Sequence, residues 1–448
     1  MGRRSFLGLL MAVASARVAY AEPPSADLAI IEATARAGYI YGLPYVEMAR
    51  TRAARLIAGG QALDRFAHRR QLATARDKAV TTPNNDTLYS SAWLDLAQGP
   101  VSLATPDFGT RYWSVALMSM TTDNFAVLGT RTIGGGPANF LIVGPDWKDH
   151  PTPEGVTLIR SPDRWVWALA RILVSGVDDL PAVHRLQDAL TLTPQNSAVA
   201  TPALPMPLKN DDAADFYRLV ADLLIESPPP AADHAMLASL TAIGLVPGQR
   251  FNTAGWQNDQ TAALATGIAT AKAYLETART SRARSAVNGW SLPPPQIGNF
   301  GDNYALRAAV ALGGLAALPA DEAMGLAYVG DGAPITGTQR WRLVFKEGEL
   351  PPADAFWSLS LYERTPEGRL FFYDNPLDRF SIGDRTPGLV TGSDGSLELL
   401  IGHMAPADRE TNWLPAPSGA FALILRVYLP RPAMRQGRWR PPQLSPVP

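Results

Sequence analysis

The spacing of apolar positions changes along the chain and predicts where helices give way to strands. Over residues 26–58, apolar side chains recur at helical spacing from Leu28 through Ile31 to Tyr39. The sequence Gly42-Leu43-Pro44 is expected to kink or interrupt this helix, because proline lacks a backbone donor and crowds the preceding turn. The chain is therefore expected to open with a helix.

Beyond Thr82 the apolar runs become short or alternating, which is typical of β-strands. Turn-forming sequences such as Gln98-Gly99-Pro100 and Gly144-Pro145-Asp146 separate several of these runs. This spacing favours antiparallel strands in a sandwich or a barrel. The predicted strands lie at residues 88–96, 112–118, 125–128, 140–143, 156–159 and 165–172.

The middle of the chain returns to helical periodicity, and the last third returns to strands. Helices are predicted at residues 183–190, 213–226, 233–243, 260–277 and 304–318. Strands are predicted at residues 341–345, 356–362, 370–373, 397–401 and 421–428. The proline-rich tail, residues 430–448, is expected to be extended on the surface.

Together these patterns predict a mainly β protein with a helical connector between two antiparallel β-sandwich domains. The expected division is a signal peptide at residues 1–21, a β-rich domain with a leading helix at 22–190, a helical connector at 191–300 and a C-terminal β-sandwich domain at 301–448. The oligomeric state is left open by the sequence.

The first residues have the features of an export signal. Arg3 and Arg4 precede a short apolar run, and Ala19-Tyr20-Ala21 offers a cleavage site. The run Arg-Arg-Ser-Phe-Leu fits the twin-arginine export pattern, although Gly2 and Gly8 differ from its usual flanks. An ordinary secretory signal and a membrane anchor are the alternatives, but the apolar run is shorter than the roughly 20 residues that span a bilayer. We expect a periplasmic protein with no stable membrane anchor after cleavage.

Composition excludes several classes of function. The 448 residues are 46% hydrophobic and 18% charged, which indicates a globular protein. Cleavage would lower Lys plus Arg from 40 to 37 against 41 Asp plus Glu, a net charge of −4, so nucleic acid is not an expected partner. There is no cysteine for a disulfide, a thiolate nucleophile or a lipid anchor.

Familiar reaction motifs are also missing from the sequence. There is no Gly-x-Ser-x-Gly elbow and no glycine-rich phosphate loop, and the five histidines are far apart and outside metal-binding patterns. No metal site is predicted and the cofactor stays unknown, although folding could still bring distant ligands together.

Polar clusters at predicted strand edges supply the candidate site. In the first cluster, Asn84, Asn85, Asp86 and Tyr89 combine amides, a carboxylate and a ring that could hold a small ligand. The same sequence is turn chemistry, in which side chains cap their own backbone, and the residues alone favour that interpretation.

Two further clusters lie in the last third of the chain. Beside Asn375, Arg379 could clamp a carboxylate in bidentate fashion, or it could pair with a neighbouring aspartate, Asp374 or Asp378. Beside Asn412, Trp413 offers a flat apolar face and a donor nitrogen to a ligand. The more ordinary role for that tryptophan is to fill the core between the sheets.

Motifs spread along the chain, among them residues 85–90 and 412–417, resemble those of a bacterial family that pairs domain of unknown function 1254 with domain of unknown function 1214. The first domain is suggested by Tyr41-Gly42-Leu43-Pro44 and by residues 85–90, 111–113 and 129–131. The second is suggested by residues 356–359, 375–379, 412–417 and 426–428.

The resemblance implies two sandwich or jelly-roll-like domains joined by helices, and it implies no settled activity. It adds Arg111 to the candidate ligand-binding residues. Ser119 is a departure, because relatives are expected to carry an acid there.

Two functions are weighed, with a third behind them. The first is an envelope protein that binds a small polar or anionic ligand between the two domains. The second is a metal-independent hydrolase or other enzyme in which Asp86 is the general acid or base, Asn85 and Tyr89 orient the substrate, and Arg379 holds an anionic group. An enzyme loaded with a metal before export is the third and weakest hypothesis.

Overall fold

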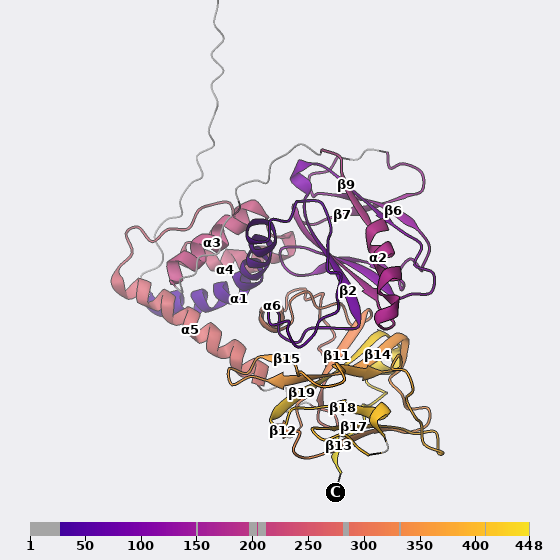
Figure 1. The fold of residues 1–448 in the computed structure, drawn as a ribbon. Helices are drawn as coiled ribbons and strands as arrows, with labels where there is room; N and C mark the ends of the chain where they lie inside the picture. Colours follow the sequence, from indigo (N-terminus) through magenta and orange to yellow (C-terminus); the bar gives the residue numbers. More distant parts are fainter. Residues whose placement is uncertain are drawn as a thin grey trace, which may run out of the picture.

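The computed structural model describes residues 27–148, 151–196, 204, 212–280, 286–330, 333–407 and 409–447. In this part of the chain the protein is mainly β, with sheets in two lobes and most helices gathered beside them (Figure 1). The expected signal peptide, residues 1–21, lies outside the described residues. None of the helices in the described part is long and apolar enough to cross a membrane.

Two sheets form the N-terminal lobe and share one apolar core that contains Leu88, Val115, Phe140 and Ile172. The first sheet contains, in spatial order, β1 (Ala67–His68), β2 (Thr87–Asp95), β8 (Trp165–Leu173), β4 (Trp113–Met118) and β5 (Asn124–Gly129). The second contains β7 (Val156–Arg160), β6 (Ala138–Val143), β3 (Val101–Thr105) and β9 (Thr191–Pro194). The pairing of β6 with β7 is parallel, which departs from the purely antiparallel prediction.

Two more sheets form the C-terminal lobe around a core that contains Leu343, Trp357, Leu399 and Leu423. The larger sheet has the order β10 (Trp290–Ser291), β11 (Ala323–Tyr328), β19 (Ala420–Pro430), β14 (Ala353–Arg364) and β15 (Leu370–Phe372), with β12 (Ile335–Thr336) on β19 and β16 (Ser381–Gly383) on β14. The smaller sheet has the order β18 (Trp413–Pro415), β17 (Leu397–Gly402), β13 (Trp341–Phe345) and β20 (Ser445–Pro446). Here β17 and β18 run parallel.

A helical group lies beside the lobes, and glycines set how closely its helices pack. A Cβ atom at Gly42 would lie 2.6 Å from a methyl carbon of Val220, and one at Gly267 would lie 2.4 Å from the carbonyl oxygen of Glu32. The group consists of α1 (Leu28–Ala53), α3 (Ala213–Glu226), α4 (His234–Leu240), α5 (Asn258–Thr280) and α6 (Tyr304–Gly313); α2 (Leu180–Ala189) and α7 (Pro432–Arg435) lie on the N- and C-terminal lobes.

Helix α1 continues through Pro44, so of the two outcomes expected at Gly42-Leu43-Pro44, a kink or an interruption, the interruption does not occur. Residues 41–46 are all buried against the rest of the helical group, and this packing outweighs the hydrogen bond that proline removes. Asp27 caps the start of the helix by accepting from the backbone nitrogen of Ala29 at 2.9 Å.

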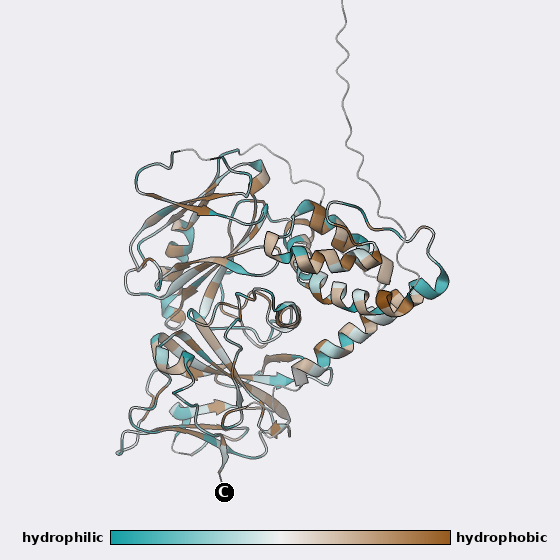
Figure 2. Ribbon diagram, turned by 180° about the vertical axis from the view of Figure 1, so that it is seen from behind, coloured by the Kyte–Doolittle hydropathy of each residue, from teal (hydrophilic) through white to brown (hydrophobic). Residues whose placement is uncertain are grey.

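Strand β8 shows how the lobes and the helices meet, because every one of its residues is buried. Alternate residues such as Ala170 face the N-terminal core, whereas Trp165 and Leu169 join the core built by the helices. That helical core also includes Phe356 of β14 and Tyr428 of β19. The N-terminal sheet is therefore covered on its outer face by helices and by the C-terminal lobe, and hydrophobic residues lie mainly on the strands and helices (Figure 2).

The tail is more ordered than the sequence predicts. Residues 430–447 include helix α7, and β20 pairs with β13 through Arg342 and Ser445. At the other expected boundaries, β9 continues the N-terminal lobe to residue 194, and β10 joins the C-terminal sheet at residues 290–291.

Candidate functional site

The segment that precedes β2 lies against the large C-terminal sheet. The phenol of Tyr362 on β14 donates to the carbonyl oxygen of Pro83 at 2.7 Å. The amide of Asn84 donates to the phenol oxygen of Tyr428 on β19 at 2.6 Å. We call this contact between residues 82–89 and strands β14 and β19 the lobe junction.

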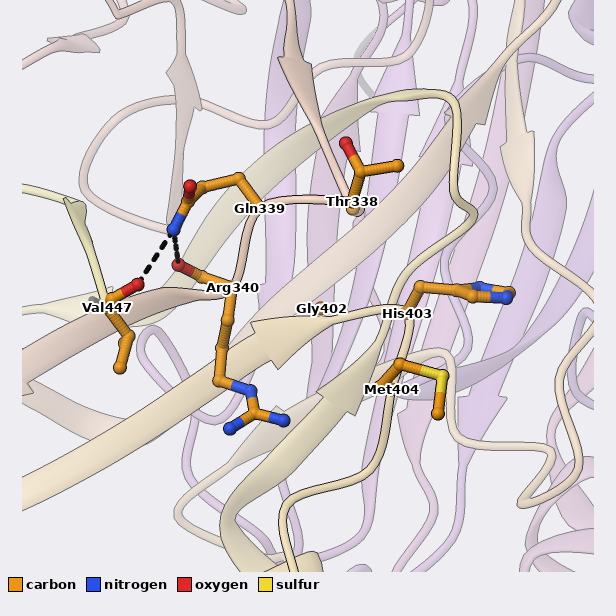
Figure 3. Close-up of a pocket in the computed structure, with 8 residues that line it drawn as sticks. Thr338, Gln339, Arg340, Gly402, His403, Met404 and Val447 are labelled. Carbon is orange, nitrogen blue, oxygen red and sulfur yellow. Dashed lines mark hydrogen bonds between the residues drawn. The ribbon is translucent and has the colours of Figure 1, made fainter.

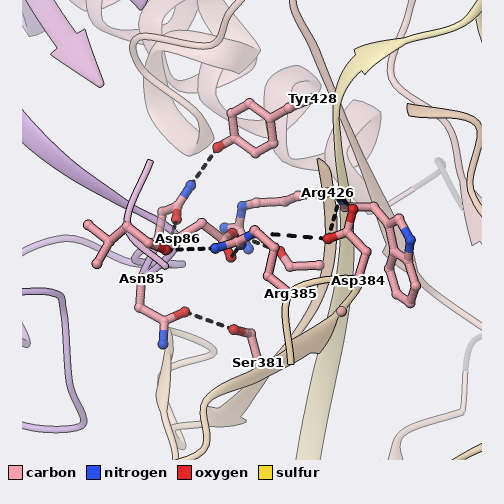
Figure 4. Close-up of polar contacts among 12 residues, drawn as sticks. Asn85, Asp86, Ser381, Asp384, Arg385, Arg426 and Tyr428 are labelled. Carbon is pink, nitrogen blue, oxygen red and sulfur yellow. Dashed lines mark hydrogen bonds and ion pairs between the residues drawn. The ribbon is translucent and has the colours of Figure 1, made fainter. Parts of the chain in front are cut away.

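Asp86 is the buried centre of the lobe junction (Figure 4). Its Oδ1 atom accepts from Arg385 Nη2 at 2.6 Å, and its Oδ2 atom accepts from Ser358 Oγ at 2.7 Å. Arg385 also donates to the carbonyl oxygen of Val174 at 2.8 Å and lies over the ring of Phe356 at 4.4 Å. Both carboxylate oxygens are therefore occupied by groups from the other lobe.

The two asparagines combine the roles that the sequence left open. Asn84 Oδ1 accepts from the backbone nitrogen of Asp86 at 2.6 Å, which is the expected turn contact, while its amide reaches the other lobe. Asn85 Oδ1 accepts from Ser381 Oγ at 3.2 Å across the junction.

Arg171, on β8 opposite Tyr89 of β2, brings a second cation to the junction. The residue is only 6% exposed, donates from Nη2 to the carbonyl oxygen of Ala316 at 2.9 Å, and lies 5.4 Å from the ring centre of Tyr89. Its Nη1 atom has no hydrogen-bond partner, and no carboxylate pairs with it among the described residues. Burial raises the pKa of Tyr428, and the charges of Arg426 and Arg171 oppose that rise, which places Arg171 near this phenol.

Three residues at the junction have backbone angles that side chains rarely adopt. Thr82, Ala316 and Leu429 have φ angles of 51°, 65° and 50°. The carbonyl oxygen of Thr82 accepts from Arg426 at 3.1 Å, that of Ala316 accepts from Arg171, and Leu429 follows Tyr428 in β19. Each such backbone conformation costs about 1–3 kcal/mol, which contacts with the surrounding structure must offset. Backbone strain of this kind clusters at functional sites.

Positive charge exceeds negative charge at the junction. Among the described residues, the junction holds three guanidinium groups, those of Arg171, Arg385 and Arg426, and two carboxylates, those of Asp86 and Asp384. A further buried carboxylate, Glu322, bonds the phenol of Tyr112 but is paired with Arg131. Burial raises the pKa of Asp384 to about 6, against the opposing hydrogen bond from the backbone nitrogen of Trp357. Mild acid therefore removes a negative charge and enlarges the excess.

The other candidate from the N-terminal lobe, Arg111, lies close by but is fully engaged. Its guanidinium makes a bidentate pair with Asp179, at 2.5 and 2.7 Å, and donates to the carbonyl oxygen of Leu173 at 2.7 Å. Ser119, where relatives were expected to carry an acid, bonds the hydroxyl of Thr121 at 2.7 Å.

The candidates from the last third of the chain form contacts within the C-terminal lobe. Arg379 donates to the carbonyl oxygens of Glu410 at 2.6 Å and Trp413 at 2.8 Å, so the two clusters do meet, and no aspartate pairs with it among the described residues. Trp413 is buried and donates from its indole to the carbonyl oxygen of Gly402 at 2.9 Å.

The two asparagines of these clusters shape loops. Asn375 is 7% exposed and bridges its own turn, where its Oδ1 accepts from the backbone nitrogens of Leu377 and Arg379. Asn412 is 3% exposed and holds Val390 through both the backbone nitrogen and the carbonyl oxygen of that residue. These contacts leave little of either amide for a ligand.

Sequence reasoning missed three cations and one phenol that build the junction: Arg171, Arg385, Arg426 and Tyr428. A signal for two of them was available. Arg171 and Arg426 stand within otherwise apolar strands, and a charge that a buried strand carries must meet a partner inside the protein.

The described residues contain no group of three or more histidine, aspartate or glutamate side chains that could hold a metal ion.

Fold and junction define a class: a two-lobed, mainly β protein whose lobes meet through a buried polar interface beside a helical group. Family comparisons then place the chain. A model described as "Protein of unknown function (DUF1254)" matches residues 63–194, and one described as "Protein of unknown function (DUF1214)" matches residues 325–432. The chain belongs to the proteins that pair these two domains, as the sequence motifs predict.

Two similar solved structures were found, and the first of them supports the fold. The VPA0106 protein from Vibrio parahaemolyticus is 23% identical with a TM-score of 0.69, over 93% of this chain and 100% of that one. A putative uncharacterized protein from Burkholderia cenocepacia is 14% identical with a TM-score of 0.44, over 92% of this chain and 88% of that one. No curated protein matches the chain.

Proposed function

We propose that this protein is exported to the periplasm and binds a small organic carboxylate at the lobe junction. Arg171 is the observation that carries the proposal: a nearly buried cation with no carboxylate partner and one unpaired Nη1 among the described residues. Burying a charge without a counter-ion is costly, and a bound anion would remove that cost.

The surroundings of Arg171 suit a carboxylate with an apolar body. Tyr89 is half-buried and presents its ring beside the guanidinium. Asn84 and Tyr428 supply an amide and a phenol, and Arg385, with 23% of its side chain exposed, lies at the edge of the junction. A guanidinium binds a carboxylate through two parallel hydrogen bonds, so Arg171 also supplies the orientation.

Binding is better supported than hydrolysis by Asp86. A general base needs a free oxygen within reach of the proton it takes, and both oxygens of Asp86 already accept from Arg385 and Ser358. The same contacts assign Asp86 a different task, which is to hold the lobes in register around the ligand.

The export route and the finer architecture belong to the same proposal. Each lobe has two sheets that share one core, which supports a β-sandwich in each. The pair Arg3 and Arg4 supports the twin-arginine route. Replacing both with lysine is expected to keep the protein in the cytoplasm of a bacterial host, as cell fractionation would show; unchanged periplasmic yield would contradict this route.

Binding is tested by titration calorimetry of the mature chain with sodium benzoate and sodium acetate. We expect saturable binding that Arg171→Gln weakens by at least about tenfold, because a charge-assisted hydrogen bond contributes roughly 1.5–3 kcal/mol. The matched control is Arg218→Gln, which removes an exposed arginine paired with Asp215 on α3.

Arg171→Lys separates loss of charge from loss of the fork-shaped donor, and we expect it to retain part of the affinity. Circular dichroism melting of each variant confirms that it is folded. Equal binding by the wild type and by folded Arg171→Gln would overturn the proposal.

A further inference from the structure

A cavity lies at one end of the smaller C-terminal sheet, and none of its lining residues belongs to the lobe junction (Figure 3). Its volume is about 320 Å³, which is at the lower end of the roughly 300–1,000 Å³ typical of small-molecule sites. The turn before β13, the end of β17 and the last described residue supply its walls. The lining consists of Gly337, Thr338, Gln339, Arg340, Gly402, His403, Met404 and Val447.

Among the described residues that line the cavity, the permanently charged side chain is a cation, Arg340. No carboxylate is among the lining residues, and the guanidinium of Arg340 makes no hydrogen bond or ion pair within the described part of the chain. Arg342, two residues further along and inside β13, instead lies 3.9 Å from the carboxylate of Glu398. The cavity therefore favours an anionic group at Arg340.

His403 adds a second hydrogen-bonding position. Its Nδ1 atom lies 3.1 Å from the carbonyl oxygen of Ala416. A carbonyl oxygen only accepts, so Nδ1 carries a hydrogen, and Nε2 is left for a ligand hydroxyl, which can both donate and accept. Figure 3 shows His403 on one side of Arg340, beyond Gly402, and the Gln339 amide on the other side, next to Val447, so the hydroxyls of a ligand must lie on both sides of its charged group.

The walls are fixed by close backbone contacts. A Cβ atom at Gly337 would lie 2.0 Å from the carbonyl oxygen of Pro417, so only glycine fits there. The amide of Gln339 donates to the carbonyl oxygens of Arg340 and Val447, at 2.9 and 2.8 Å, which leaves its own oxygen free of these bonds. The cavity is thus shaped before any ligand arrives.

From these contacts we propose that the cavity binds a small polyhydroxylated anion. Arg340 takes the anionic group, and His403 Nε2 and the Gln339 amide oxygen form hydrogen bonds with hydroxyls. The anionic group is a carboxylate, as in a sugar acid, or a phosphate, as in a sugar phosphate, because a guanidinium recognises both.

The test is titration of the full mature chain with glucuronate, glucose 6-phosphate and glucose at about 150 mM salt, which screens the remaining surface charges. We expect one of the two anions to bind at least about tenfold more tightly than glucose, and the identity of that anion distinguishes carboxylate from phosphate. Arg340→Gln should lower its affinity at least about tenfold, and His403→Gln by about threefold.

Arg342→Gln is the matched control, because it makes the same change of charge two residues away, in β13 and outside the cavity lining. It should leave the affinity unchanged, as should Arg171→Gln at the lobe junction. Binding of neither anion, glucose binding as tightly as the anions, or equal effects of Arg340→Gln and Arg342→Gln would overturn the proposal.

Discussion

Two of the buried carboxylates, Asp233 and Asp86, lie where distant segments meet, and the charge around them is balanced differently. In the helical group, Asp233 accepts from the phenols of Tyr41 at 3.0 Å and Tyr304 at 2.9 Å. Arg307 lies 3.9 Å from Asp233 and 3.0 Å from Asp123. At the lobe junction, Asp86 has an arginine and a serine as donors, and two further arginines stand nearby.

The helical group and the lobe junction differ in their balance of charge more than in their number of unpaired donors. Arg307 also keeps buried nitrogens without a hydrogen-bond partner, as Arg171 does, but two carboxylates face its charge. Burial and the Asp233 carboxylate raise the pKa of Tyr304 to about 12, so this phenol stays a donor at neutral pH. In the helical group two carboxylates face one guanidinium, so no further anion is needed there, whereas the lobe junction has more guanidinium groups than carboxylates.

The largest expected effect comes from removing the acid of the lobe junction. Asp86→Ala leaves Arg385 without its counter-ion and should lower the free energy of unfolding by about 3 kcal/mol, measured by urea denaturation. Asp354→Ala is the control, because its pair with Arg431 is about 60% exposed and should change stability by less than about 1 kcal/mol. Equal losses in the two variants would mean that Asp86 does not hold the lobes together.

A smaller effect is expected from the acid of the helical group. Asp233→Ala removes the acceptor of two phenols and should cost about 2 kcal/mol in the same assay, because the buried Tyr41 hydroxyl is left unpaired. Carboxylate affinity should not change in this variant. If Asp233→Ala lowered carboxylate affinity as much as Arg171→Gln does, the helical group would affect binding as strongly as the lobe junction, which contradicts the comparison.

The smallest effect concerns pH at the lobe junction. Because the pKa of folded Asp384 is about 6, above its ordinary value near 3.8, the folded state holds a proton that the unfolded state has lost between about pH 4 and 6. The contribution of Asp384 to stability is therefore present below that window and falls as the pH rises through 6. Asp384→Asn should melt higher than the wild type at pH 7.5, and the gap should close at pH 4.

Asp394 provides a control, because its pKa is shifted in the opposite direction to that of Asp384. A hydrogen bond from Ser396 lowers the pKa of this exposed aspartate, so Asp394→Asn should not raise the melting temperature at pH 7.5. If both variants melt higher at pH 7.5, the gain would come from reduced net charge and not from burial of Asp384.

Much of the fold can be predicted from the local spacing of apolar residues. Helix α3 covers exactly the predicted residues 213–226, and β13 covers the predicted 341–345, because apolar contrast is strong in both. Strand β3 was missed, since the small residues of Val-Ser-Leu-Ala-Thr give a weak pattern. The passage of α1 through Pro44 depends on contacts with α3 and α5, which no local pattern contains.

Of the residues at the lobe junction, only those from the N-terminal lobe could be predicted from the sequence. Asn84, Asn85 and Asp86 stand in one polar run, and loop chemistry marks them. Their partners Ser358, Arg385 and Tyr428 lie more than 270 residues away, and only the packing of the two lobes brings them together. The charge of Arg379 suggests a ligand contact, but in the fold its guanidinium donates to backbone carbonyl oxygens of its own lobe.

The short strand β20 has a practical consequence for anyone who shortens the chain. It pairs with Trp341 and Arg342 and so covers the outer backbone edge of β13 in the smaller C-terminal sheet. Deleting residues 444–447 would expose that edge as a template for strands from other molecules, and the shortened protein should self-associate into aggregates.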